Sequence, residues 1–241
     1  MEYALKVIKK QDWRINKHIQ SEIAILKEIH DDHIVNLYET FETAQEVCLV
    51  LDLVNGVELF EKVVELKNYS EDDARELTTS ILKTLDYLHS QGIVHRDLKP
   101  ENLLLPANGS LSEVKLTDFG MAAKLKQGEV MYQMCGSEGY MAPEMAEGIG
   151  YNTQVDMYSL GCICYILLSG YPPFIPVSFP GPEWNRVSTN AIDFVSGLLQ
   201  LNPVNRMSAK QALKHRWIVS KEIQHDLSPA QRSLQKFQKK D

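Results

Sequence analysis

Apolar and polar residues near the N-terminus alternate with the period of two that is typical of β-strands. Tyr3, Leu5 and Val7 are separated by residues that would face the other side of such a strand. Isoleucines and leucines then recur at spacings of three and four, which indicates a helix. The pattern predicts, in order, a strand, a helix and two strands joined by a polar turn, over residues 1–8, 16–29, 35–41 and 46–53.

From Ser70 onward the predicted elements are mainly long helices. Ser70 is a good N-cap, and Asp73 three residues later completes the pattern of a helix start. Residues 153–169 are apolar on all sides, so we expect a buried helix there. Amphipathic helices are also predicted at residues 189–201 and 208–216, a short strand at 93–94, and a hairpin around Asn108-Gly109 from 103–105 and 114–117.

The change from strands to helices near residue 55 predicts an α+β fold with two lobes. We expect a small β-rich lobe over residues 1–54, a mainly helical lobe over residues 55–219, and a basic amphipathic tail over residues 220–241. A cleft where two lobes join is a usual place for a small ligand.

Composition narrows the classes of function. The net charge of −7 argues against a general nucleic-acid-binding protein, because clustered Lys and Arg provide affinity for the phosphate backbone. No apolar run reaches the roughly 18–20 residues of a membrane span. Lysines at positions 6, 9 and 10 interrupt any N-terminal signal peptide. Four cysteines without metal-ligand spacing predict reduced thiols in a cytoplasmic or nuclear protein.

The strongest chemical signal is a pair of motifs in the middle of the chain. His-Arg-Asp-Leu-Lys-Pro-Glu-Asn occupies residues 95–102, and Asp-Phe-Gly follows at 118–120 after a short apolar strand. Phosphoryl transfer needs a carboxylate to accept a hydroxyl proton, a cation beside the phosphate, and oxygen ligands for Mg²⁺. We therefore predict Asp97 as the catalytic base and Lys99 as the phosphate contact. Asn102 and Asp118 are the predicted Mg²⁺ ligands.

Together these motifs resemble those of the eukaryotic protein kinases, and the resemblance covers nearly the whole chain. It implies a bilobal protein kinase fold that transfers the γ-phosphate of ATP to protein Ser or Thr, with Mg²⁺ as cofactor. Lys99 favours Ser or Thr over Tyr as the acceptor. Lys6 resembles the lysine that holds the α- and β-phosphates, and Glu22 resembles its ion-pair partner. Without the resemblance, such a pair would more often be a solvated surface pair.

The resemblance also implies an adenine pocket. Residues 49–54 are similar to the strand and hinge that receive the base in kinases. Leu51 would guard the back of the pocket, and the backbone of Asp52 and Val54 would bond the base. Leu104 would close the pocket from below, although taken alone it is simply a core residue.

Within the kinases, the sequence is most similar to the calcium/calmodulin-dependent group, in particular the calcium-dependent protein kinases. The similarity is carried by residues 58–60, 128–130, 135–137 and 141–144. It implies that Glu58 and Glu101 present carboxylates to a basic residue upstream of the phospho-acceptor. We therefore expect a preference for Arg-x-x-Ser/Thr peptides.

Two structural anchors are implied by the same resemblance. Glu144 is expected to pair with Arg206, and Asp156 to hold the backbone of the catalytic loop.

The activation segment has an unusual composition for a kinase regulated by phosphorylation. Arg96 has the position that pairs with an activation-loop phosphate in the family, yet Ser137 is the only Ser or Thr between Asp118 and Glu144. Ser137 itself matches a position with a structural hydroxyl. We expect Glu129 to supply a fixed negative charge, so that activity requires no phosphorylation of this loop.

The tail over residues 226–241 is predicted to start a helix at Ser228-Pro229. Apolar residues recur at spacings of three and four, and four basic residues make the segment positive. It resembles the opening of the autoinhibitory helix that binds calmodulin or a calmodulin-like calcium-binding module in this group. A plain packing helix at the end of a domain explains the pattern equally well, so both interpretations stay open.

The sequence departs from the kinase pattern in two places. No Gly-x-Gly-x-x-Gly precedes Lys6, so the loop that covers the phosphates is missing together with its flanking strands. Residues 175–183 contain three prolines where relatives have a helix. We expect a fragment or spliced form of a working kinase, or an incomplete gene model, with reduced ATP affinity and turnover.

Two other functions are weighed against this expectation. A noncatalytic or weakly active regulatory fragment is the main alternative, because the glycine-rich loop is absent. A phosphatase or nuclease built on Asp97 and Asp118 is a weaker one, since such enzymes use clustered acids and histidines to hold two metals.

Overall fold

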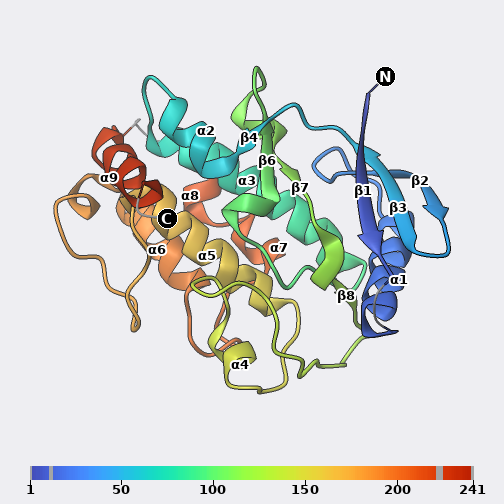
Figure 1. Ribbon diagram of the computed structural model, residues 1–241. Helices are drawn as coiled ribbons and strands as arrows, with labels where there is room; N and C mark the ends of the chain where they lie inside the picture. The colour runs from blue at the N-terminus through green and yellow to red at the C-terminus, as the bar shows by residue number, and fades with distance from the viewer. Residues whose placement is uncertain (1, 11–12, 221–224, 240–241) are drawn as a thin grey trace.

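The computed structural model describes residues 2–10, 13–220 and 225–239. The remaining positions, including parts of the predicted first strand and of the tail, lie outside the described residues. The small N-terminal part is a three-stranded antiparallel sheet in the order β1-β3-β2, with α1 beside it (Figure 1). Its elements are β1 (Tyr3–Lys9), α1 (Trp13–Glu28), β2 (Leu37–Glu42) and β3 (Glu46–Asp52).

The predicted helix of this part is confirmed, and it begins three residues earlier than the sequence pattern suggested. Ile19, Leu26 and Ile29 are buried as expected, while Ile23 is half-buried and Ile25 joins the core. Burial of this face fixes α1 and therefore the direction in which its polar residues point.

Two small sheets follow, and the predicted motifs lie next to their strands. β4 (Gly56–Glu58), β6 (Leu103–Pro106) and β7 (Lys115–Leu116) form one sheet, and β5 (Ile93–Val94) pairs with β8 (Ala123–Lys124). The predicted hairpin exists as the β6–β7 pair. Its connection is longer than a tight Asn-Gly turn, because a 3₁₀ turn at Leu111–Glu113 lies within it.

The large part is a bundle of helices around one buried helix (Figure 1). Ser70 and Asp73 form the predicted capping box, and residues 155–169 of the central helix are all buried. Among the helices of the described residues, none combines the length and apolarity needed to cross a membrane. The helices are α2 (Leu59–Glu65), α3 (Glu71–Ser90), α4 (Pro143–Ala146), α5 (Gln154–Ser169), α6 (Thr189–Leu198), α7 (Ala209–Ala212), α8 (Arg216–Val219) and α9 (Ser228–Gln238).

The single helix predicted at residues 208–216 is wrong. The structure has α7 and α8 instead, separated by extended backbone at His215. The His215 ring accepts a hydrogen bond from Trp217 N–H and so caps a new helix. Residues 175–183 form no helix, as their three prolines predicted.

Candidate active site

The register of β6 and β7 brings the two motifs together. Leu103 pairs with Leu116, so the residues just outside this pair, Asn102 and Thr117, lie opposite each other. Thr117 N–H donates to the Asn102 carbonyl at 2.9 Å. Asp118 follows at once and has a left-handed backbone with φ of 60°. The catalytic loop and the Asp-Phe-Gly motif are therefore joined at one end of this strand pair.

Asp97 is held by hydrogen bonds from two neighbours. Ser137 Oγ donates to Asp97 Oδ1 at 2.8 Å, and Asn102 Nδ2 donates to Asp97 Oδ2 at 3.3 Å and to its carbonyl at 2.8 Å. Lys99 Nζ lies 3.4 Å from Asp97 Oδ2 and donates to Ser137 Oγ at 2.9 Å. The structure thus gathers the three predicted catalytic residues, and the predicted structural hydroxyl of Ser137 fixes the carboxylate among them.

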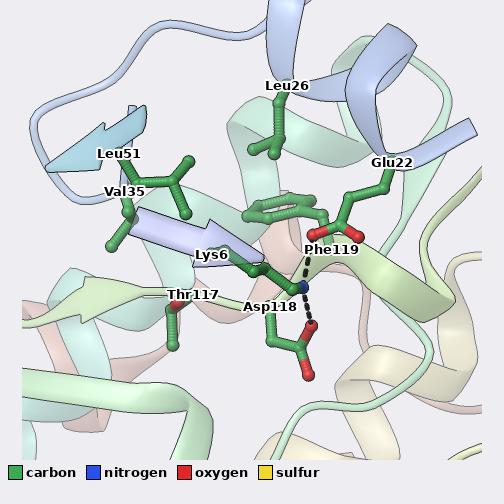
Figure 2. Close-up of a pocket in the computed structure, with 8 residues that line it drawn as sticks. All are labelled: Lys6, Glu22, Leu26, Val35, Leu51, Thr117, Asp118 and Phe119. Carbon is green, nitrogen blue, oxygen red and sulfur yellow. Dashed lines mark hydrogen bonds and ion pairs between the residues drawn. The ribbon is translucent and has the colours of Figure 1, made fainter. Parts of the chain in front are cut away.

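Lys6 connects the small sheet to the Asp-Phe-Gly motif. Its Nζ lies 2.6 Å from Glu22 Oε1 on α1 and 3.1 Å from Asp118 Oδ1 (Figure 2). These side chains line a cavity of about 210 Å³. Leu51, predicted to guard the back of the adenine pocket, also lines this cavity, on the wall away from the charged groups in Figure 2.

Electrostatics favour opposite charges on Lys6 and Asp118. Burial alone would lower the pKa of Lys6, but the hydrogen bond and charge of Glu22, with a further contribution from Asp118, raise it. Burial alone would raise the pKa of Asp118, but Lys6 and the Gly120 N–H lower it. Lys6 is therefore a cation and Asp118 an anion near neutral pH.

The donor set fits Mg²⁺. The amide nitrogen of Asn102 is committed to Asp97, which leaves its oxygen as the atom suited to a cation. One oxygen of Asp118 binds Lys6, and the other points away from Lys6 (Figure 2). Bound there, Mg²⁺ would neutralise phosphate charge, and Asn102 with Asp118 are the residues that would hold it.

The catalytic loop is fixed from beneath by Asp156 of α5, as predicted. The buried carboxylate accepts from the N–H groups of His95 and Arg96 at 2.9 and 2.8 Å, and from His89 Nε2 at 2.9 Å. Burial alone would raise the pKa of Asp156, but the His89 hydrogen bond and charge lower it. This anchor stabilises the left-handed backbone of Arg96, which has φ of 69°.

The predicted pairing of Arg96 with Glu129 is wrong. The Arg96 guanidinium donates to the Met121 carbonyl at 2.6 Å, to Tyr151 OH at 3.2 Å and to Gln133 at 3.4 Å. Glu129 instead accepts from the N–H of Lys126 at 3.0 Å. Neutral acceptors close to the guanidinium therefore take the place that the prediction gave to a carboxylate.

The predicted adenine residues are less tightly grouped. The Asp52 side chain has a structural role, because Tyr38, Asn36 and Lys115 all donate to it. Its N–H donates to the Asn36 carbonyl, so its own carbonyl is the backbone group that could meet a base. Val54 is half-buried just beyond β3.

Leu104 lies on β6, between Glu58 of β4 and Lys115 of β7. It is half-buried, and it is not among the residues that line the cavity of Lys6.

Glu58 and Glu101 meet in a second cavity, of about 280 Å³. Glu61 and the tail residue Phe237 also line it, and neither was predicted from the sequence. Burial, and then the charges of Glu61 and Glu101, raise the pKa of Glu58. Glu61 lies one helical turn beyond Glu58, so its spacing was the signal that could have placed it here.

The apolar wall of the cavity beside Lys6 was not predicted from the sequence either. Leu26 of α1, Val35 and Phe119 line it beside Lys6. Leu26 was expected to belong to the core, and its contribution to the cavity depends on how α1 packs against the Asp-Phe-Gly motif.

Comparison with known proteins identifies the family. A family profile described as protein kinase domain matches residues 1–218. The chain is 41% identical over 251 residues to calcium/calmodulin-dependent protein kinase type IV of Mus musculus, covering 98% of this chain and 53% of that protein. It is 42% identical over 234 residues to myosin light chain kinase A of Dictyostelium discoideum, covering 90% and 79%. It is 39% identical over 230 residues to calcium/calmodulin-dependent protein kinase type 1 of Macrobrachium nipponense, covering 89% and 66%.

The chain therefore belongs to the protein kinase family, and within it to the calcium/calmodulin-dependent kinase group. It spans about half the length of the type IV kinases it matches.

Proposed function

We propose that this chain is a serine/threonine protein kinase that transfers the γ-phosphate of ATP with Mg²⁺. The observation that carries the proposal is that β6 and β7 bring the catalytic loop, with Asp97, next to Asp118, which binds Lys6. Asp97, held by Ser137 and Asn102, would accept the substrate hydroxyl proton. Lys6, beside Asp118, would orient the nucleotide phosphates.

The direct test measures phosphate transfer from Mg-ATP to Ser- and Thr-containing peptides, with Tyr peptides and Mg²⁺-free reactions as controls. Thermal unfolding with Mg-ATP adds an independent readout, because a ligand that binds the folded state raises its stability. Transfer together with a raised midpoint supports the proposal. A midpoint unchanged at millimolar Mg-ATP, with no transfer, supports the alternative of a noncatalytic regulatory fragment.

A preference for Arg-x-x-Ser/Thr is the finer part of the proposal. Glu58 and Glu101 line one cavity, and burial, followed by the charges of Glu61 and Glu101, raises the pKa of Glu58, so a guanidinium there would favour its charged form. Matched peptides with Arg or Ala three residues before the acceptor test it. Equal kcat/KM for both peptides contradicts the preference.

Calcium-loaded calmodulin binding to α9 is a further part. The exposed Arg232 and Lys236 give α9 positive charge, as calmodulin-binding helices require. Ala230 and Leu234 are buried against the large part, so binding would require α9 to leave that position. Calorimetric titration with calmodulin, with and without Ca²⁺, tests this. No heat of binding in Ca²⁺ supports a plain packing helix.

A further inference from the structure

The short helix α2 ends against the side chain of Gln231 on α9, and the two helices lie in contact. Gln231 Nε2 donates to the carbonyls of Val63 and Leu66 at 2.7 Å each, and it lies 3.5 Å from that of Val64. The last carbonyls of a helix have no partner within it. One amide of the tail therefore satisfies the C-terminal end of α2.

The opposite end of α2 carries the acidic cavity. Glu58 is the N-cap residue of α2, and Glu61 lies in its first turn. Both line the cavity with Glu101. No side-chain hydrogen bond caps α2 at Glu58. The placement of these two carboxylates therefore depends on contacts made elsewhere along the helix.

Helix α2 has seven residues, and a helix this short is not stable without tertiary contacts. Leu59, Phe60 and Val63 are buried in the core. Lys62 Nζ donates to the carbonyls of Pro106 and Ala107 at 3.3 and 2.6 Å. These contacts fix the side of the helix, whereas Gln231 fixes its end.

We infer that Gln231 is a positioning residue for substrate selectivity, which acts by holding α2 so that Glu58 and Glu61 face the same cavity as Glu101. The inference rests on the proposed Arg preference. The docked helix α9 would then help to form the acidic cavity, because it also brings Phe237 to the wall of that cavity.

The test uses the whole chain and the matched Arg and Ala peptides. Gln231→Met keeps the length of the side chain and removes its donors. Gln235→Met makes the same change at an exposed position of α9 and is the control. Gln231→Lys restores a donor and places a cation at the negative end of α2.

Gln231→Met should lower the ratio of kcat/KM for the Arg peptide over the Ala peptide by about fivefold, as the loss of a modest interaction would. Gln235→Met and Gln231→Lys should keep the wild-type ratio. A merely structural role would lower the unfolding midpoint and affect both peptides equally. If Gln231→Met does not fold, Gln231→Asn, whose amide is one methylene shorter, replaces it.

The outcomes separate the two claims. An unchanged ratio in Gln231→Met, in an enzyme whose wild type prefers Arg, overturns this inference alone. A wild type that is indifferent to Arg overturns the proposed preference and this inference together.

Discussion

Lys6 and Arg206 each bind a glutamate, but in opposite surroundings. Arg206 forms a two-pronged pair with Glu144 at 2.6 and 2.9 Å, and the two side chains are 0% and 4% exposed. The Lys6 side chain is 36% exposed and faces an open cavity with Glu22 and Asp118. An ion pair with glutamate is therefore a buried structural contact at Arg206 and part of an open site at Lys6.

The two cations also differ in how many of their N–H groups already have partners within the protein. Arg206 also donates to the carbonyls of Gln154 and Gln200, and it lies over the Tyr158 ring. Its bonding capacity is used inside the protein. Lys6 has two acidic partners and an ammonium group on the cavity wall, where phosphate oxygens could join them. A buried pair with a full set of partners indicates stability, and an accessible, partly bonded pair indicates function.

The largest effect on activity should come from loss of the proposed catalytic base, Asp97. Asp97→Asn should lower kcat by about 10²–10⁴-fold, because Asn cannot accept the hydroxyl proton. Its oxygen can still accept from Ser137, so the unfolding midpoint should stay close to that of wild type. Single-turnover phosphate transfer measures the effect. Retention of wild-type kcat would remove Asp97 from the mechanism.

A change in the buried Arg206–Glu144 ion pair should lower the free energy of unfolding. Glu144→Gln leaves the buried Arg206 without its counter-charge, which should cost about 3–5 kcal/mol of unfolding free energy. Urea denaturation measures this loss. Glu42, an exposed partner of Lys10, gives the control variant Glu42→Gln, which should cost at most about 1 kcal/mol. Equal losses in the two variants would contradict the assignment of a structural role from burial.

Lys6→Met should give the reverse result. We expect kcat/KM to fall by about 10²–10³-fold, because a preorganised charge on the phosphates is lost. The free energy of unfolding should fall less than in Glu144→Gln, since the Lys6 side chain is partly exposed and only the buried Glu22 loses its counter-charge. The Mg-ATP-dependent rise of the unfolding midpoint should shrink in the same variant. A variant that loses stability but keeps its activity would assign Lys6 to the same class as Arg206.

Local patterns predicted the open site better than its surroundings. Asp97, Asn102 and Asp118 lie close together because one short strand pair separates their motifs, and both motifs are visible in the sequence. Phe237 meets Glu58 and Glu101 only through the docking of α9, which no local period encodes.

Two of the errors have the same physical cause, competition from a contact that sequence patterns do not show. Arg96 and Glu129 have complementary charges, but a backbone carbonyl and Tyr151 reach the guanidinium instead. The helical period over residues 208–216 is genuine, yet α7 ends at Ala212 and the His215 side chain caps the start of a separate helix, α8.

The smallest expected effect concerns the pH dependence of the acidic cavity. Burial, followed by the charges of Glu61 and Glu101, raises the pKa of Glu58 above the ordinary 4.5. A raised carboxyl pKa means that Glu58 takes up its proton at a higher pH than a free glutamate and loses its charge there. The KM for an Arg peptide should therefore rise by about threefold as the pH falls from neutral through this raised pKa, as for a partly exposed ion pair.

The matched Ala peptide should show no such rise. Glu61→Gln removes one repelling charge, so the rise should begin at a lower pH. Parallel pH profiles for the two peptides would show that the cavity does not bind the guanidinium. Substrate recognition by the open site would then involve only the nucleotide and the acceptor hydroxyl.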